Sequence, residues 1–428
     1  MAQTTIPYGD PIAVQLHSAN LFKEVMQRKS ILGRLVGKMP NDTKTSRLQT
    51  TQRMPIVRCT DLETKAGKEV LFDLLNPIQG KPIMGERFAE GHGERLSFSQ
   101  DSIKIDQTRK PVSAGGRMTQ QRTPHDLRDA AYTEAKDYFE RLEDQMTLVH
   151  LAGARGFDRG TEWVIPTNDD PDFGEITINR VKAPSRNRHY VAAGDIIEPV
   201  SATGGEIKIN TTDLMTIDTI DAIGAALDSM HLPPISVQFP GDEAAIDDPI
   251  RVLLVSPFQY ASIKQSKDFR LFQAMAGNRG QLVKDKIYQP LFFGQVGLWN
   301  GILVVKMNKA IRFYPGDPIH WCAGRDGEET TTDTVPRDWN GYAVDRALLL
   351  GGQALMEAFG NYGDKHGRPT GSPCFWSEKL LDHDDKLEIL AGMVGGKSKV
   401  RFNVDHGAGV EATDFGVIAI DTAVRLIG

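Results

Sequence analysis

A two-residue period in the hydrophobic positions of the first quarter of the chain predicts a β-hairpin. Val70, Phe72 and Leu74 alternate with polar residues, and Leu96 and Phe98 answer them after an interval rich in turn-forming residues. That interval, GKPIMGERFAEGHGE, contains four glycines and a proline, so it predicts a long tip and not a tight two-residue turn. An isolated two-stranded ribbon is marginally stable in water, so we expect it to lie on another surface, of the same chain or of a neighbour.

The apolar phase changes along the returning strand of this hairpin. Leu96 and Phe98 are even-numbered, whereas Ile103 and Ile105 are odd-numbered. A β-bulge or bend near Gln100–Asp101 would bring all four side chains to one face, and we predict one there.

The segment after the hairpin has the period of an amphipathic helix. Thr123 is the expected N-cap, Pro124 the first helical residue, and Gly153 the end. Over residues 124–152 such a helix is about 40 Å long. We interpret its apolar stripe as core packing, with no cofactor: Leu127, Ala131, Ala135, Tyr138, Leu142, Met146 and Val149.

The rest of the chain shows shorter patterns. Residues 154–210 are polar and predict an elaborated loop region, and residues 212–230 a second amphipathic helix. The segment ALLLGGQALMEAF (347–359) predicts a buried helix, and the alternation over 415–424 a final strand. Between these lie a predicted buried strand at 252–255, a helix from Pro257, and a hairpin over 291–305 turning at Asn300-Gly301.

Composition narrows the class of protein. With 428 residues, 40% apolar and 25% charged, the chain predicts a soluble globular protein of two or three domains. Its start has no signal-peptide pattern, and no stretch reaches the ~18 apolar residues of a membrane span, so we expect neither secretion nor membrane insertion. Cys59, Cys322 and Cys374 are far apart and form no CxxC, which favours a reducing compartment without disulfides.

The charge is uneven along the chain. The net charge is -6, which gives no support to a sequence-specific DNA-binding protein. Residues 17–58 nevertheless carry +7 and the remainder −13. Such a basic arm suits docking onto copies of itself or onto nucleic acid, and a merely solvated surface is an equal alternative. The arm includes Lys23, Arg28, Lys29 and Arg34.

The common catalytic constellations are missing from the sequence. GGKS at 395–398 resembles the end of a phosphate-binding loop, but Ala391 stands where that loop needs glycine, so we predict a turn. The DHDD cluster at Asp382–Asp385 could hold a hard cation, although a charged turn is the favoured interpretation. His150 predicts a packed or capping side chain. There is no HExxH and no GxSxG, which shifts weight from catalysis to assembly.

Three stretches resemble the phage N4 gp56-type major capsid proteins of the HK97-fold capsid superfamily. The first is TTIPYGDP together with IDQTRKPVSAGGRMTQQRTPHDLRDAA and YFERLEDQMTLVHLAGARG. The second is PLFFGQVGLWNGILVV followed by RALLLGGQAL, and the third is FWSEKLLDHDDKLEILAGMVGGKSKVRF followed by DFGVIAIDTAV. They cover most of the chain in order. Asp382–Asp385 departs from the aromatic turn usual in the family, and residues 323–338 look like a local insertion.

The resemblance implies an α+β HK97-like fold divided into five parts. These are an N-terminal arm (1–60), a long hairpin or E-loop (61–110), a peripheral domain with the spine helix (111–212), an axial domain (213–370) and a returning C-terminal segment (371–428). Some members of the superfamily crosslink their hairpins through lysine, and Lys81 near the tip raises that idea, although no partner Asn or catalytic Glu is marked.

The implied function is a non-enzymatic major capsid protein of a tailed double-stranded DNA phage. Copies would form hexamers and pentamers of an icosahedral head, assembled in the bacterial cytoplasm and located in the virion. The expected partners are the chain itself, a portal protein, scaffold or decoration proteins, and packaged DNA; no cofactor, metal or membrane is expected. The alternatives are an encapsulin-like compartment and, much more remotely, a metal-dependent enzyme using Asp382–Asp385. Candidate intersubunit contacts are Lys23, Arg28, Lys29, Arg34, Gly80, Lys81, Pro82, Arg87 and Phe88.

Overall fold

The structure is a computed structural model of the chain. The described residues are 30–37, 53–60, 62, 67–75, 81–85, 87–88, 90–93, 98–122, 126–158, 160, 162–200, 207–329, 331–362, 372–405 and 409–426. No helix among them is long and apolar enough to cross a membrane.

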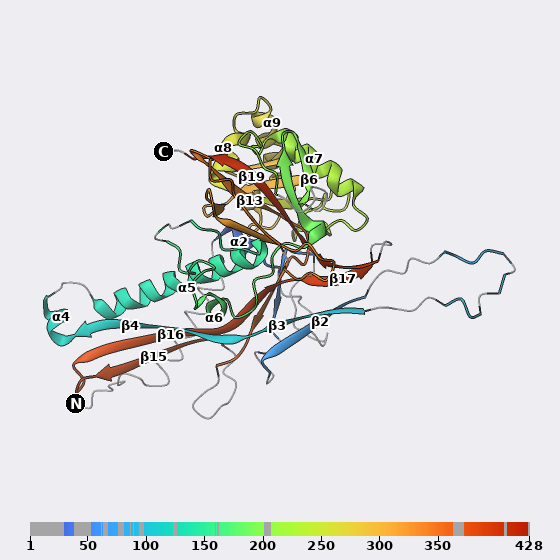
Figure 1. Cartoon of the computed structure of the whole chain (residues 1–428). Helices are drawn as coiled ribbons and strands as arrows, with labels where there is room; N and C mark the ends of the chain where they lie inside the picture. The colour runs from blue at the N-terminus through green and yellow to red at the C-terminus, as the bar shows by residue number, and fades with distance from the viewer. Residues whose placement is uncertain are drawn as a thin grey trace.

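A long sheet carrying one long helix forms the lower part of the molecule (Figure 1). Its central strand, β16 (Lys386–Lys399), pairs antiparallel with three others: β14 (Leu355–Phe359), β15 (Cys374–Leu381) and β4 (Asp106–Gly116). β1 (Ile56–Cys59) adds a parallel edge on β14. Helix α5 (Leu127–Ala152) follows the short α4 (Arg117–Arg122) and lies along this sheet. The predicted spine helix and its core-facing stripe are therefore present.

Only the N-terminal end of α5 differs from the prediction. The N-cap is Asp126 and not Thr123, because the Asp126 carboxylate accepts hydrogen bonds from the backbone N–H groups of Arg128 and Asp129. Gly153 ends the helix as predicted, in the left-handed conformation with φ 65°. Within the stripe, Tyr138 is half-buried and the neighbouring Phe139 is the fully buried ring.

An eight-stranded sheet forms the upper part (Figure 1). Its strand order is β6-β5-β19-β13-β7-β9-β8, with β10 paired to β13. The bounds are β5 (His189–Ala193), β6 (Ile196–Pro199), β7 (Arg251–Val255), β8 (Val296–Trp299), β9 (Ile302–Lys306), β10 (Ile311–Phe313), β13 (Tyr342–Leu350) and β19 (Val417–Arg425). Both faces of the central strands are buried, which explains their continuous apolar runs.

Helices cover this sheet. They are α7 (Ile217–Ser229), α8 (Pro257–Ile263) and α9 (Phe269–Leu282). The predicted helix at 212–230, strand at 252–255, helix from Pro257 and final strand are confirmed as α7, β7, α8 and β19. The hairpin turns at Asn300-Gly301, both with positive φ, although Leu291 belongs to a preceding 3₁₀ turn.

Smaller elements complete the structure. The described residues between 154 and 188 form mainly loops, as predicted, with the short α6 (Phe173–Thr177) and η1 (Arg186–Arg188), but the predicted loop region also contains β5 and β6 of the upper sheet. Others are α2 (Ile31–Arg34) and η3 (Gln289–Phe292). Three two-stranded ribbons are β2 (Glu69–Leu75) with β3 (Phe98–Lys104), β11 (Pro318–Trp321) with β12 (Thr331–Thr334), and β17 (Arg401–Asp405) with β18 (Val410–Asp414).

The predicted buried helix over 347–359 is wrong. This segment contains the end of β13 and the whole of β14, joined at Gly351–Ala354. A short continuous apolar run is compatible with either a buried helix or a buried strand, because it shows no alternation of apolar and polar residues that would distinguish the two. The chain comes very close to its surroundings at this corner: a Cβ on Gly351 would lie 2.5 Å from the Ile235 carbonyl oxygen.

The predicted turn at GGKS is also wrong, since these residues continue β16. Gly396 is required by close packing, because a Cβ there would lie 2.0 Å from the Lys104 carbonyl oxygen. Lys397 is buried, and its Nζ lies 2.7 Å from Glu143 Oε2 and 2.8 Å from Glu357 Oε1. The glycines and lysine thus serve packing between α5, β14 and β16, and not phosphate binding.

We predict that Lys397→Met destabilises the unassembled subunit by about 3–5 kcal/mol, because it leaves buried Glu143 and Glu357 without their shared cation. Lys386→Met is the matched control in the same strand, since Lys386 makes an ion pair with Asp382 that is exposed to solvent and should contribute little to stability. Urea unfolding followed by circular dichroism compares the two. Equal losses would contradict the assigned role.

His150 is a packed residue, as predicted. Its Nε2 lies 3.2 Å from the Thr177 carbonyl oxygen, to which it must donate, and burial lowers the pKa of His150 to about 4 from 6.5. The folded state therefore binds fewer protons than the unfolded state between these values. Stability should fall as pH drops from 6.5 to 4, by ~3 kcal/mol from this residue. His150→Gln should reduce that loss in unfolding experiments across pH, whereas His92→Gln in an exposed segment should not.

Candidate assembly hairpin

The base of the hairpin is part of the subunit's own core. Strands β2 and β3 pair in continuous register, with Val70 opposite Ile103 and Phe72 opposite Asp101. The Phe72 ring packs edge-on against Phe402 of β17, with centroids 5.8 Å apart. The expectation that this ribbon needs another surface is met at its base by the same chain.

The predicted bulge near Gln100–Asp101 is absent from the described pairing of β2 with β3. Because register is continuous, Asp101 and Ser99 occupy inward positions beside Phe72, while Phe98 is 61% exposed. Leu96 lies outside the described residues. The change of apolar phase therefore marks polar side chains on the inner face and not an extra residue.

Those inward polar side chains anchor the hairpin. The Asp101 carboxylate forms an ion pair with Lys182 Nζ at 2.6 Å. It also accepts a hydrogen bond from the Arg401 backbone N–H at 3.0 Å. Ser99 Oγ accepts from the Asn403 backbone N–H at 2.7 Å. Alternate N–H groups of the β17 edge are thus satisfied by β3 side chains, which holds the ribbon against the body.

A side-chain amide holds the junction between β3 and β4. Asn179 Oδ1 accepts from the Lys104 N–H at 2.9 Å, and Asn179 Nδ2 donates to the Lys104 carbonyl at 2.8 Å. These two hydrogen bonds imitate a β-bridge. They lie where the chain stops pairing with β2 and begins to pair with β16. Gly396 fits closely against the same Lys104 carbonyl.

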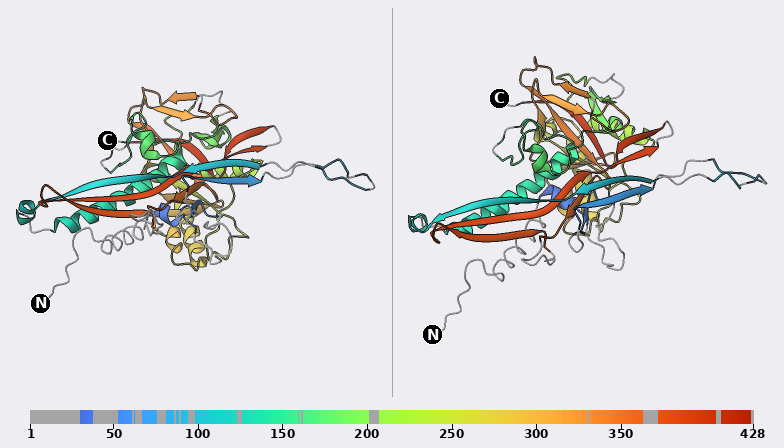
Figure 2. Two further views of the ribbon diagram at one scale, coloured as in Figure 1. Left: turned by 90° about the horizontal axis from the view of Figure 1, so that it is seen from below. Right: turned by 60° about the horizontal axis from the view of Figure 1, so that its bottom comes forward.

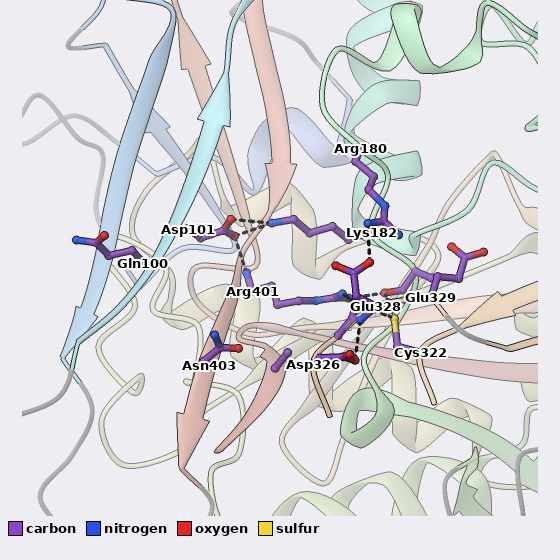
Figure 3. Close-up of a pocket in the computed structure, with 13 residues that line it drawn as sticks. Gln100, Asp101, Arg180, Lys182, Cys322, Asp326, Glu328, Glu329, Arg401 and Asn403 are labelled. Atoms are coloured by element: carbon purple, nitrogen blue, oxygen red, sulfur yellow. Dashed lines mark hydrogen bonds and ion pairs between the residues drawn. The ribbon is translucent and has the colours of Figure 1, made fainter. Parts of the chain in front are cut away.

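A charged pocket of about 210 Å³ lies beside this anchor (Figure 3). Arg401 donates to the Gly327 carbonyl at 2.8 Å and pairs with Asp414 at 2.7 Å, and Arg180 pairs with Glu328 at 3.0 Å. Burial raises the pKa of the Cys322 thiol that lines the pocket. The pocket therefore presents paired ions and a protonated thiol, which suits packing better than chemistry.

The tip projects into solvent. Its described residues, 81–85, 87–88 and 90–93, lie far beyond the ends of β2 and β3 in both views of Figure 2. Met84 is 70% exposed and Phe88 86% exposed, and Gly85 and Gly91 have positive φ. Exposed apolar side chains on a projecting ribbon are typical of a surface that another molecule covers.

The candidate contact residues fall in three places. Lys81, Pro82, Arg87 and Phe88 lie exposed on the tip. Arg34 is in α2, which packs beside α5 through a hydrogen bond from Ser30 Oγ to Asp144 Oδ1 at 2.9 Å, so the structure does not bring it to the tip. Lys23, Arg28, Lys29 and Gly80 lie outside the described residues.

The DHDD cluster forms the turn between β15 and β16. Asp382, His383 and Asp384 have positive φ, and Asp382 Oδ2 pairs with Lys386 Nζ at 2.8 Å. No group of three His, Cys, Asp or Glu side chains in the described part of the chain is placed to hold a metal. The charged-turn interpretation is confirmed.

Comparison with known proteins defines the class. A family model described as phage capsid protein matches residues 5–426. The fold is similar to the capsid of Ralstonia phage GP4, with TM-score 0.66, 24% identity and 100% of both chains covered. It is also similar to the cyanophage Pam1 capsid asymmetric unit (TM-score 0.56, 15% identity, 88% of this chain and 90% of that one). The head structure of Helicobacter pylori bacteriophage KHP40 matches with TM-score 0.55 and 10% identity, over 93% of this chain and 91% of that one.

No curated protein sequence matches. The chain belongs to the phage capsid protein family, which places it in the capsid of the virion. The HK97-like fold predicted from the sequence is confirmed.

We predict that Asp101→Ala loosens the hairpin base, because it removes the carboxylate partner of Lys182 and leaves the Arg401 N–H without its acceptor, at a cost of about 1–3 kcal/mol. Amide hydrogen exchange should accelerate in β2 and β3 while the pairing of β4 with β16 stays protected. Asp106→Ala is the control: its exposed carboxylate lies 3.5 Å from Lys68 and should matter little. Equal exchange in both variants would refute the anchor.

Proposed function

We propose that copies of this chain assemble into the hexamers and pentamers of an icosahedral head that encloses double-stranded DNA. We further propose that the chain is of the phage N4 gp56 type, on the strength of the three sequence stretches described above. Its role is structural and not catalytic. Assembly in the bacterial cytoplasm, a portal protein, and scaffold or decoration proteins belong to the same proposal.

The single observation that carries the proposal is the contrast between the hairpin's base and its tip. The base packs Phe72 and Ile103 into the subunit's own core. The tip exposes Ile83, Met84 and Phe88 to solvent. The subunit thus holds the base of the hairpin itself, whereas the exposed apolar side chains of the tip are left for a neighbouring copy to cover.

The division of the chain follows from this role. We propose the arm (1–60) and the hairpin (61–110) as the parts that reach neighbours, with Lys23, Arg28, Lys29, Arg34, Gly80, Lys81, Pro82, Arg87 and Phe88 as contacts. The peripheral (111–212) and axial (213–370) parts form the body, and residues 371–428 return through β16 and β19 to both sheets. An overall charge of -6 suits a wall that confines DNA without binding it tightly.

We predict that replacing residues 78–93 by a short Gly-Ser linker leaves the subunit folded and abolishes shells. The strands of the base lie outside the deletion, so circular dichroism should be unchanged. Negative-stain microscopy should show shells for the unchanged chain and none for the variant. Loss of the folded signal would show instead that the tip belongs to the core.

A finer variant is Met84→Ser/Phe88→Ser. Losing two apolar anchors at ~1.5–3 kcal/mol each should lower the assembled fraction at least about tenfold. Val410→Ser is the matched control, because Val410 is 60% exposed on a different ribbon. A separate measurement distinguishes a phage head from an encapsulin-like compartment. Nucleic acid inside purified shells supports the phage head, and other cargo supports the compartment.

A further inference from the structure

Helix α4 buries none of its own residues. All of Arg117–Arg122 are exposed, and the apolar Met118 is 62% exposed. An isolated helix shorter than about 12 residues is marginal in water, so a helix this short depends on packing against another surface. Its packing on the described residues is confined to the end of β4, where a Cβ on Gly115 would lie 3.2 Å from Thr119. The remaining sides of α4 therefore lack the packing that a short helix needs.

The turn between β15 and β16 lies directly beside α4. The Arg117 backbone N–H donates to the Asp385 carbonyl at 3.1 Å. Gly116, the last residue of β4, pairs with Lys386, and a Cβ on it would lie 3.0 Å from Asp385 Oδ2. The helix and the turn together form one end of the lower sheet, and Figures 1 and 2 show this end opposite to the hairpin tip. We call the following residues the far-end surface: Arg117, Met118, Arg122, Asp384 and Asp385.

The far-end surface carries both signs of charge in separate places. The cations Arg117 and Arg122 are on α4, and they are exposed. The carboxylates of Asp384 and Asp385 are in the turn, and they are exposed too. None of these four side chains forms an ion pair with another described residue, whereas Asp382 of the same turn is already paired. Cations and carboxylates thus lie side by side in one copy without pairing, which leaves both available to another molecule.

The far-end surface is complementary to itself. Met118 and Arg122 are four positions apart in α4, so they lie about 40° apart around the helix axis and form neighbouring apolar and cationic positions. A partner with only negative charge, such as nucleic acid, would be attracted by the arginines and repelled by the carboxylates beside them. A second copy offers carboxylates to the arginines, arginines to the carboxylates, and apolar surface to Met118. Charge complementarity therefore favours a second copy as the occupant.

We propose that the far-end surface of one subunit binds the far-end surface of a second copy of this chain. The arginines of α4 in each copy face the carboxylates of Asp384 and Asp385 in the other. Every copy supplies both partners of the contact, so the contact can close around a symmetry axis. This inference rests on the proposed assembly into a shell, and it names a contact at the opposite end of the subunit from the hairpin tip.

Charge reversal on either side tests the contact. Arg117→Glu/Arg122→Glu replaces the cations by carboxylates. Asp384→Asn/Asp385→Lys replaces the free carboxylates, with asparagine at position 384 because its φ of 65° is a conformation that asparagine tolerates. In each variant, identical copies then oppose like charges, so each should lower the assembled fraction about tenfold at low salt. An equal mixture of the two variants should assemble at least about threefold better than either alone, because opposite charges then meet between different copies.

Lys267→Glu/Lys286→Glu is the matched control. It changes the net charge by the same amount as the arginine variant, at exposed lysines of the upper part that form no ion pair with another described residue. It should assemble like the unchanged chain. Met118→Ser changes no charge and should lower the assembled fraction about threefold, which tests the contact without a charge reversal. Circular dichroism of the unassembled subunits should be alike for all these variants, because every substituted side chain is exposed.

Assembly of both reversed variants as in the unchanged chain would overturn the proposed contact. So would a mixture that assembles no better than its components, because the two surfaces would then not meet between copies. An equal loss in the lysine control would also overturn it, since the effect would then follow net charge. The test is independent of the tip: failure here with shells still lost on tip replacement refutes this contact and leaves the proposed function standing. Failure of the unchanged chain to form shells would refute the proposed function itself.

Discussion

The buried ion pairs of Lys397 hold together the elements on which the rest of the structure depends. One ammonium group lies between Glu143 of α5 and Glu357 of β14, and Arg58 of β1 binds the second oxygen of Glu357 at 3.0 Å. Burying charges in this way adds little net stability compared with apolar packing, but a mispaired arrangement would leave a bare charge inside the protein. The network therefore specifies the register of the spine helix on the long sheet.

The other end of α5 is tied to the upper sheet by the same kind of interaction. Arg346 of β13 donates to the Ala152 carbonyl at 3.0 Å, at the helix C-terminus where a cation is favoured. Arg346 also binds Asp421 through two hydrogen bonds, and His189 lies 2.7 Å from the same carboxylate. Burial would raise the pKa of Asp421, but Arg346 and His189 hold it well below its usual range. One buried polar network thus joins the C-terminus of α5 to three strands of the upper sheet.

Local patterns predicted the elements whose signals are local. The spine helix, α7 and the Asn300-Gly301 hairpin follow from periodicity, capping and turn chemistry. Patterns failed where tertiary contacts decide: the 347–359 run became strands because both its faces are buried, and the GGKS glycines serve close packing. Sequence reasoning missed Lys182, Asn179 and Arg401 as anchors, since their partners lie 75 or more residues away or on another ribbon. The change of phase at Ser99 and Asp101 is the available signal, and it marks inward polar side chains instead of the predicted bulge.

A shell subunit must satisfy two demands that conflict within one chain. Its body must be specified tightly enough that many copies are identical, and buried ion networks achieve this by penalising wrong registers. Its outer surfaces must remain incomplete until a neighbour arrives, which leaves the apolar side chains of Met84 and Phe88 in water. Each of these features costs the isolated subunit stability. The cost is recovered only in contact with another molecule, so the same residues that weaken the monomer drive it toward assembly.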